Sequence, residues 1–257
     1  MREGESVIVK CFKDGSNHEL DGLAYLKWRN GAGAVRVLET DSLACLMEDG
    51  GTLSLRDIHR SQGEDAANAI LARALPAIFG PADGPYPSQL RDINVHFQAL
   101  FSFAARNDLG VLEKPLRLAA EVAETLLASQ THKRPLHGDI HHENLVSRDG
   151  LTWRLIDPHG LIGDPHYDVA NLFGNPIDNA DVVLSPQRAS ALGDLLSSAL
   201  HLDRERILRF ALAHCGLSVA WHLEDARIEK LDTLPERIHL LSILRSLLSN
   251  DHSNIYS

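Results

Sequence analysis

The chain has 257 residues, which is enough for one large domain or two lobes around a sizeable core and excludes a peptide hormone or a small disulfide scaffold. Hydrophobic residues make up 44% and charged residues 23%, which is the composition of a folded globular protein rather than of a disordered one. With 25 basic and 35 acidic residues, the formal net charge is −10. This charge disfavours nucleic acid and anionic membranes as partners and suits a cationic small molecule.

The three cysteines, Cys11, Cys45 and Cys215, are far apart in the sequence and form no CxxC pair. Their number and spacing predict neither a disulfide framework nor a zinc ribbon, and we expect reduced thiols in the core. The N-terminal segment has no apolar stretch of signal-peptide length, and no segment reaches the roughly 18 apolar residues that span a bilayer. We therefore expect a cytoplasmic protein.

Residues 1–50 are rich in predicted strands. The sequence VIVKCF at residues 7–12 predicts a strand in which Lys10 is the charged exception. Ser16 and Glu19 have the spacing of a capping box, and apolar residues at helical spacing follow them, so a helix comes next. Two further strands are expected, at residues 34–39 and 43–47.

From residue 52 onward the sequence is mostly helical. Ser61 and Glu64 form a second capping box, and Pro76 is expected to end the helix that begins there. Pro115 suits the first turn of another helix. Later helices are expected at residues 167–173, 186–200, 203–227 and 235–248.

The polar stretch HGDIHHEN at residues 137–144 interrupts this helical pattern, and a predicted hairpin after it ends at Asp157. Asp139, Asn144 and Asp157 have the spacing of a kinase-type phosphoryl-transfer site. In such a site an Asp accepts the proton of the substrate hydroxyl, an Asn five residues later binds metal, and an Asp after the next hairpin holds Mg²⁺ against the nucleotide phosphates. Carboxylate and amide oxygens are the hard ligands that Mg²⁺ prefers.

Two other interpretations of this stretch stay open. An isolated match of this kind also occurs in surface turns rich in Asp, Asn and His. The residues His137, Asp139, His141 and His142 also resemble the ligand cluster of a zinc hydrolase, although their order and spacing differ from the HxHxDH pattern. Histidines beside a catalytic loop more often hydrogen-bond to the backbone, and we expect that role here.

Further features favour the kinase interpretation. Lys10 in its strand and Glu19 on the next helix have the arrangement in which an ion pair aims a lysine at nucleotide phosphates. After the third strand, the carbonyl of Glu48 and the N–H of Gly50 are placed to pair with an adenine edge. The order of these elements predicts an α+β, protein-kinase-like two-lobed fold. Residues 1–50 would form a truncated small β lobe with the nucleotide-binding strands and helix. Residues 51–257 would form a mainly helical large lobe with the catalytic loop, the magnesium site and the acceptor-binding helices.

Four segments carry a more specific signal: AYLKWRNGAGAVRVL at residues 24–38, LHGDIHHENL at 136–145, IDPHGLIGDPHYDVANLFGNP at 156–176 and GLSVAW at 216–221. They resemble the aminoglycoside phosphotransferase family, and within it the branch of streptomycin 6-phosphotransferases and hydroxyurea kinases. The resemblance implies ATP and Mg²⁺ as cofactors and phosphate transfer to a hydroxyl of a cationic, streptomycin-like acceptor, which is an antibiotic-resistance reaction. It also implies residue roles: Asp139 as the catalytic base, Asn144 and Asp157 as magnesium ligands, and Lys10 and Glu19 as the phosphate-positioning pair.

The start of the chain departs from the family pattern. Kinase-like enzymes place two strands and a nucleotide-covering loop before the lysine strand, whereas nine residues precede Lys10 here. We expect either that Met1 is an internal methionine or that the lobe is truncated, and that the chain as it stands is a weak or inactive kinase. The strand at residues 7–12 would then be an exposed edge that favours self-association. The alternative function is a pseudokinase-like or regulatory binding module that lacks a complete nucleotide loop.

The sequence does not identify the residues that bind the acceptor. Acidic candidates in the helical part cannot be told apart from a solvated helix face. They are Asp164, Asp178, Glu224 and Asp225.

Overall fold

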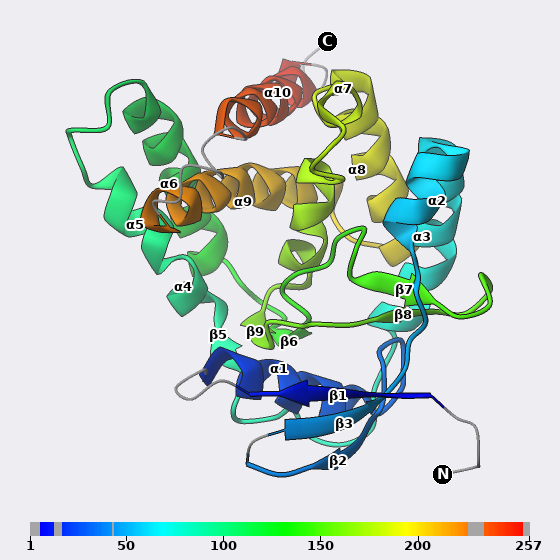
Figure 1. Cartoon of the computed structure of the whole chain (residues 1–257). Helices are drawn as coiled ribbons and strands as arrows, with labels where there is room; N and C mark the ends of the chain where they lie inside the picture. The colour runs from blue at the N-terminus through cyan, green and yellow to red at the C-terminus, as the bar shows by residue number, and fades with distance from the viewer. Residues whose placement is uncertain (1–5, 13–16, 43, 226–233, 254–257) are drawn as a thin grey trace. The chain divides into compact units, whose positions relative to one another are not determined.

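The computed structural model describes residues 6–12, 17–42, 44–225 and 234–253, which form helices and short strands (Figure 1). The chain divides into two compact units. Unit 1 comprises Met1–Arg91 and Arg134–Ile162, and unit 2 comprises Asp92–Lys133 and Gly163–Ser257. The lobe boundary expected at residues 48–51 falls inside unit 1, and the division into lobes at that point stays a prediction.

Unit 1 begins with an antiparallel sheet of order β1-β3-β2 and one helix (Figure 1). Its elements are β1 (Val7–Cys11), α1 (Asn17–Arg29), β2 (Val37–Thr40) and β3 (Ala44–Glu48). The register places Lys10 of β1 opposite Cys45 of β3. Strand β1 is therefore an edge strand, as the sequence predicts, and its apolar Ile8 and Val9 are 46% and 62% exposed. The capping residue Ser16 expected at the start of α1 lies outside the described residues.

The rest of unit 1 consists of two helices and the strands around the polar motif. They are β4 (Leu53–Ser54), α2 (Leu55–Gln62), α3 (Glu64–Phe79), β6 (Arg134–Leu136), β7 (Leu145–Ser147) and β8 (Trp153–Leu155). Strands β4, β7 and β8 form the second sheet, in that order. The third sheet has the order β5-β9-β6, and β5 (Arg91–Asp92) and β9 (Leu161–Gly163) are segments in which the chain passes from one unit to the other.

The second capping box expected from the sequence is wrong. Ser54 is the N-cap of helix α2, and its hydroxyl accepts the N–H of Asp57 while the Asp57 carboxylate accepts the N–H of Ser54. Ser61 lies inside α2, and its hydroxyl donates to the carbonyl of Asp57. Helix α3 starts at Glu64 with no side-chain cap. The capping box of this region is therefore formed by Ser54 and Asp57, and it satisfies N–H groups at the start of α2.

Pro76 does not end its helix, contrary to the expectation. It lies inside α3, which continues to Phe79. The proline removes one backbone hydrogen bond. The side chains on either side of it, Leu75 and Ile78, are buried to 0% and 2% exposure. Burial of this apolar face favours the helical conformation on both sides of the proline.

Unit 2 is helical and is organised around α9. Its elements are α4 (Ile93–His96), α5 (Gln98–Ala104), η1 (Gly110–Leu112), α6 (Glu113–Ala128), η2 (Pro165–Gly174), α7 (Ala180–Val183), α8 (Pro186–Leu200), α9 (Arg204–Asp225) and α10 (Leu234–Ser253). Helix α9 packs against α5, α6, α8, α10 and η2 (Figure 1). Every residue of α9 from Phe210 to Ala220 is buried, so this helix forms the core of the unit.

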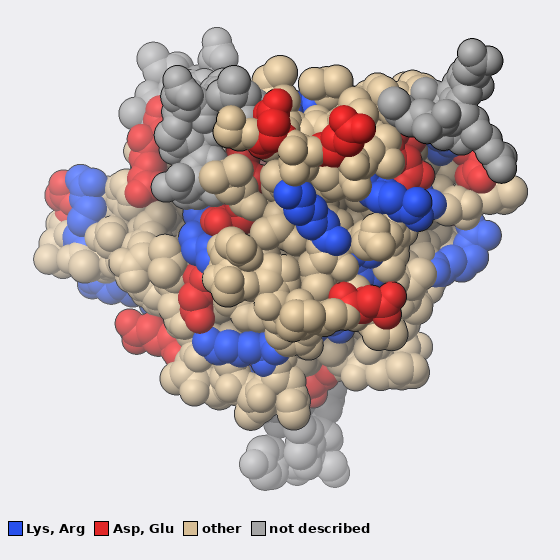
Figure 2. Space-filling model, turned by 90° about the horizontal axis from the view of Figure 1, so that it is seen from below, with Lys and Arg blue, Asp and Glu red and all other residues tan. Residues whose placement is uncertain are grey.

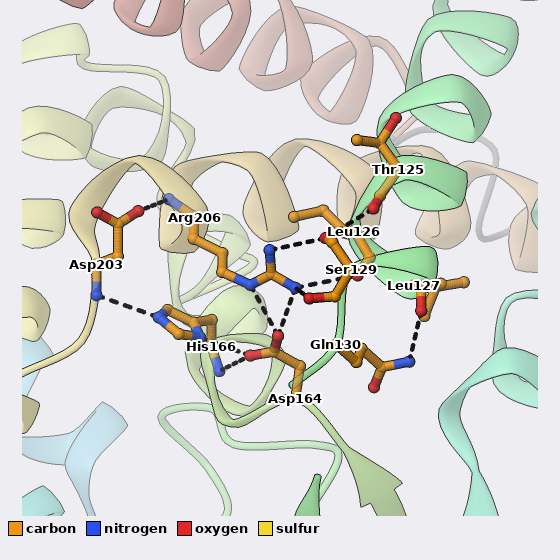
Figure 3. Close-up of polar contacts among 9 residues, drawn as sticks. All are labelled: Thr125, Leu126, Leu127, Ser129, Gln130, Asp164, His166, Asp203 and Arg206. Carbon is orange, nitrogen blue, oxygen red and sulfur yellow. Dashed lines mark hydrogen bonds and ion pairs between the residues drawn. The ribbon is translucent and has the colours of Figure 1, made fainter. Parts of the chain in front are cut away.

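A buried polar cluster joins three helix ends in unit 2 (Figure 3). Asp164 caps η2 by accepting the N–H and the imidazole Nδ1 of His166 at 3.0 and 2.5 Å. Its second oxygen accepts Nε of Arg206 at 2.7 Å, and Arg206 also donates to the carbonyl of Leu126 at 3.0 Å. Asp164 is therefore part of the scaffold rather than the solvated acceptor candidate that the sequence allowed. The hydrogen bonds from His166 and Arg206 outweigh burial and hold the pKa of its carboxyl below the ordinary value.

Arg206→Ala is expected to lower the free energy of unfolding by about 3 kcal/mol, because it leaves the Asp164 carboxylate buried without its cation. The side chain of Asp164 is only 6% exposed. Arg209→Ala on the same helix is the control, because its pair with Glu205 is about one-third exposed and should contribute less than about 1 kcal/mol. Urea unfolding of both variants measures the difference, and equal losses would contradict the assignment.

The prediction that the cysteines lie in the core is confirmed for two of the three. Cys45 and Cys215 are buried, but Cys11 is exposed on the edge strand, so its expected place in the core is wrong. Among the described residues, no helix combines the length and the apolar character needed to cross a membrane. The face shown in Figure 2 carries acidic and basic side chains interspersed, without a broad patch of either sign.

Candidate active site

The polar loop and the hairpin after it bring the candidate site residues together in unit 1. Asn144 directly precedes β7, and Asp157 follows the end of β8 by two residues. The N–H of Ile156 donates to the carbonyl of Asn144 at 3.0 Å. The hairpin therefore sets Asn144 beside Ile156, the residue that precedes Asp157, although both strands of the hairpin and their turn lie between Asn144 and Ile156 in the sequence.

Asn144 holds Asp139 through its amide nitrogen. Nδ2 of Asn144 donates to the Asp139 carboxylate at 3.1 Å and to the Asp139 carbonyl at 2.9 Å. Because both bonds use the nitrogen, the amide oxygen of Asn144 faces away from Asp139. Neither bond engages the amide oxygen of Asn144, which is a hard donor of the kind that Mg²⁺ prefers.

Two histidines approach the same carboxylate oxygen of Asp139. Its Oδ2 lies 3.4 Å from Nε2 of His141 and 3.9 Å from Nε2 of His159. Burial alone would raise the pKa of Asp139, but the hydrogen bond from His141 and the nearby His159 outweigh burial and hold that pKa well below its ordinary value. Asp139 is therefore an ionised acceptor, suited to orienting a hydroxyl and to taking its proton late in a transfer reaction.

His137 is a buried clamp between the loop and the hairpin. The N–H of Asp139 donates to Nδ1 of His137 at 3.2 Å, so Nδ1 carries no proton, and Nε2 donates to the carbonyl of Ile156 at 2.8 Å. Burial lowers the pKa of His137 to about 4, although the Asp139 charge opposes the shift. The expectation that a histidine beside this loop hydrogen-bonds to the backbone is confirmed at this position.

The burial of neutral His137 predicts a loss of stability in acid. Between about pH 6.5 and pH 4 the unfolded chain binds a proton at this residue that the folded chain does not, so stability falls by about 3 kcal/mol as the pH falls through this range. His137→Gln should flatten that part of the profile, whereas the exposed His132→Gln should leave it unchanged. Urea unfolding at a series of pH values measures both, and parallel profiles for wild type and His137→Gln would refute the prediction.

Lys10 pairs with Asp157 rather than with the expected partner. Its Nζ lies 3.1 Å from Oδ1 of Asp157, and the two side chains are 37% and 58% exposed. Glu19 lines the same small cavity, but the expected Lys10–Glu19 ion pair is not formed among the described residues, and the buried Oε2 of Glu19 has no hydrogen-bond partner there. A lysine stem has four rotatable bonds, so its position in a strand does not decide which of two nearby carboxylates it contacts. Asp157 also has a φ of 51°, a left-handed conformation that Asp adopts more readily than most residues.

Two glycines let α1 lie directly against the segment after Asp157. A Cβ on Gly22 would lie 2.1 Å from the carbonyl oxygen of Pro158. A Cβ on Gly160, whose φ is +68°, would lie 2.1 Å from the carbonyl oxygen of Asp21. Both distances are too short for real atoms, so the two backbones touch only because these residues have no side chain. This contact fixes α1 beside the candidate metal ligand.

The connector at residues 48–51 packs against the β7–β8 hairpin. The Glu48 carboxylate accepts the N–H of Arg36 at 3.2 Å and lies 3.4 Å from Nε of Arg154. A Cβ on Gly50 would lie 2.8 Å from the side chain of Val146 in β7. The pairing of the Glu48 carbonyl and the Gly50 N–H with adenine stays a prediction.

Some groups of the site were not found from the sequence. Nothing in the sequence placed His159 beside Asp139, because its neighbours in the chain lie on a different loop. Arg154 was also missed, since a charged residue in a short strand has no distinguishing pattern. Among the described residues, no group of three or more His, Cys, Asp or Glu side chains is arranged to hold a metal ion, so the geometry that a zinc hydrolase needs is not found there.

Solved structures with similar folds are small-molecule kinases. A choline/ethanolamine kinase family protein from Mesorhizobium loti has a TM-score of 0.65 at 14% identity, over 95% of this chain and 87% of that one. Aminoglycoside phosphotransferase APH(3'')-Id from Streptomyces rimosus, solved with ADP and streptomycin, has a TM-score of 0.55 at 20% identity, over 82% of this chain and 86% of that one. The chain therefore has the protein-kinase-like fold, which confirms the fold predicted from the sequence.

Sequence comparison narrows this class to one family. A streptomycin 3''-kinase from Klebsiella pneumoniae is 37% identical over 209 residues, which cover 79% of this chain and 76% of that protein. A streptomycin 6-kinase from Streptomyces griseus is 30% identical over 205 residues, which cover 76% of this chain and 64% of that protein. Residues 1–226 match the family described as aminoglycoside/hydroxyurea antibiotic resistance kinase, and the chain belongs to that family. It is a phosphotransferase with an alcohol group as acceptor.

Proposed function

We propose that the chain transfers the γ-phosphoryl group of ATP to a hydroxyl of a streptomycin-like aminoglycoside. The observation that carries this proposal is the grouping, within unit 1, of an ionised carboxylate, the amide that holds it, and a second carboxylate paired with the strand lysine: Asp139, Asn144, Asp157 and Lys10. Family relatives solved with ADP or AMP-PNP support ATP as the donor.

Each residue has a distinct proposed role. Asp139 accepts the hydrogen bond of the acceptor hydroxyl, orients its oxygen toward the γ-phosphorus and takes its proton as the new P–O bond forms. Lys10 binds phosphate oxygens, and Glu19, which lines the same cavity, is the proposed partner that orients it. The Glu48 carbonyl and the Gly50 N–H pair with the adenine edge.

The donor set fits Mg²⁺. Asp157 presents an exposed carboxylate, and Asn144 presents an amide oxygen turned away from Asp139, so both offer hard oxygen ligands. Bound there, Mg²⁺ would neutralise charge on the phosphate oxygens. Asn144 would then bind the metal through its amide oxygen while its amide nitrogen holds Asp139. This side chain would therefore fix the position of the base relative to the metal.

A cationic acceptor suits the net charge of −10. The relatives quoted above are named for phosphorylation of two different streptomycin hydroxyls, 3'' and 6. The proposal therefore names streptomycin as the acceptor, and the experiment decides which of the two hydroxyls receives the phosphate.

The test combines binding and turnover. Mg-ATP is titrated into the purified chain by calorimetry, ADP release is followed with and without streptomycin, and the product is assigned by NMR. Streptomycin-dependent ADP release with phosphate on the 3''- or 6-hydroxyl is the expected result. Nucleotide binding without release would exclude this acceptor. Absence of nucleotide binding would support the regulatory module, which family membership does not favour.

Two further proposals concern the setting of the reaction. Because the donor is ATP, we place the enzyme in the cytoplasm.

The exposed Ile8 and Val9 on the edge strand β1 form the surface through which two copies would pair. Sedimentation at increasing protein concentration tests this pairing, and a monomer at all concentrations would refute it.

A further inference from the structure

Arg148 joins three segments of unit 1 through one guanidinium group. It lies in the turn between β7 and β8, and its Nε donates to the carbonyl of Asp49 in the connector at 2.9 Å. One terminal nitrogen donates to the carbonyl of Ser6, just before β1, at 3.2 Å and lies 3.1 Å from the Asp49 carboxylate. The hairpin turn, the connector and the start of the lysine strand are thus held by a single side chain.

Asp49 is the centre of this arrangement. The hydroxyl of Ser6 and the N–H of Gly51, at 2.8 Å, bond to its carboxylate, and together with Arg148 they hold the pKa of Asp49 below the ordinary value. A Cβ on Gly51 would lie 2.3 Å from the carbonyl oxygen of Ser147, so the connector backbone touches the end of β7. The connector is therefore fixed to the hairpin both by charge and by close backbone packing.

A second arginine of the hairpin strengthens the same link one residue earlier in the connector. Nε of Arg154 in β8 lies 3.4 Å from the Glu48 carboxylate, and Nη1 of Arg154 donates to the carbonyl of Gly31 at 2.7 Å. Arg148 and Arg154, with Glu48 and Asp49, form what we call the hairpin–connector clamp. Both arginines come from the hairpin, and both acidic residues come from the connector.

We propose that Arg148, through this clamp, is a positioning residue for the nucleotide. The inference rests on the proposed function. The connector carries the groups proposed to bind adenine, and the two ends of the hairpin carry Asn144 and Asp157, proposed to hold the metal at the phosphates. A nucleotide has to contact both sites at once. A clamp that fixes the distance between them before binding therefore lowers the entropy cost of nucleotide binding.

The chemistry of the clamp requires arginine. The guanidinium group presents a planar fork of donors that reaches two backbone carbonyls and a carboxylate together, whereas a lysine ammonium group forms a single point charge. The side chain of Arg148 is 48% exposed, so its replacement leaves no buried cavity and the chain is expected to fold.

The experiment compares Arg148→Gln and Arg148→Lys with wild type and with Arg106→Gln, which removes an exposed arginine that pairs with the exposed Asp108 and lies over the Phe103 ring. Calorimetry measures the Kd of Mg-ATP, steady-state kinetics separate KM for ATP from KM for streptomycin and from kcat, and hydrogen exchange without nucleotide reports the amides of residues 49–51. For Arg148→Gln we expect Kd and KM for ATP to rise about tenfold, kcat and KM for streptomycin to change less than about twofold, and connector exchange to accelerate. Arg148→Lys should lie between wild type and Arg148→Gln, and Arg106→Gln should match wild type.

Two outcomes would overturn the proposal. One is unchanged nucleotide affinity and unchanged exchange in Arg148→Gln. The other is an equal loss in kcat and in both KM values, which would indicate general disruption instead of nucleotide positioning. If wild type binds no nucleotide, the proposed function fails, and unchanged connector exchange in Arg148→Gln would then overturn the clamp independently.

Discussion

Asp139→Asn is expected to lower kcat by a factor of roughly 10² to 10⁴ while leaving Mg-ATP binding close to that of wild type. Asparagine has nearly the shape of aspartate and can still accept the hydrogen bond from Asn144, so the loop should keep its structure. It lacks the negative charge that orients the acceptor hydroxyl and takes its proton. Streptomycin-dependent ADP release, with calorimetry of Mg-ATP on the same preparation, measures both quantities.

The control for this variant is Asp108→Asn, which makes the same chemical change at an exposed surface pair in unit 2. It should leave kcat unchanged. Turnover of Asp139→Asn close to that of wild type, in a preparation free of contaminating kinase, would remove Asp139 from the role of base. Loss of Mg-ATP binding together with turnover would show instead that the loop had been disrupted.

Asp157→Ala is expected to abolish magnesium-dependent ATP binding, because it removes the exposed carboxylate that we place nearest the phosphates. The effect should differ from that of Asp139→Asn, which lowers turnover but keeps binding. Calorimetry with Mg-ATP, and with ATP in the presence of a chelator, separates the contribution of the metal from that of Lys10. In wild type, the chelator should weaken binding strongly, whereas in the variant it should make no further difference.

The result that contradicts this prediction is equally specific. If Asp157→Ala binds Mg-ATP as tightly as wild type does, the metal is held elsewhere and the proposed role of Asp157 is wrong. Asp108→Ala again serves as the control, since it deletes a carboxylate of similar exposure with no proposed ligand role.

The fold could be predicted from the sequence where local pattern and tertiary structure agree. Strand β1 and helix α8 were predicted closely, because the first is β-branched and apolar around a single charged residue and the second has Ser185 before it and a proline in its first turn. The capping box predicted at Ser61 and Glu64 was wrong, because Ser61 lies inside α2 and the capping box of this region is formed by Ser54 and Asp57. The continuation of α3 past Pro76 was missed because burial of its apolar face is not a local property.

The candidate site divides in the same way. The spacing from Asp139 to Asn144 and the hairpin before Asp157 are local, so the sequence indicated them together. The partner of Lys10 is not local: two carboxylates line one cavity, and spacing along the chain favoured Glu19 where the folded protein places Asp157. The arginines of the clamp were missed for a related reason, since their partners lie about a hundred residues earlier in the chain.

The contact of α1 with the segment after Asp157 limits how such an enzyme can be regulated. At Gly22 and Gly160, backbone lies against backbone with no room for a methyl group. A helix seated in this way cannot slide or rotate along the loop without a steric clash, so regulation by a shift of α1 along this loop is disfavoured.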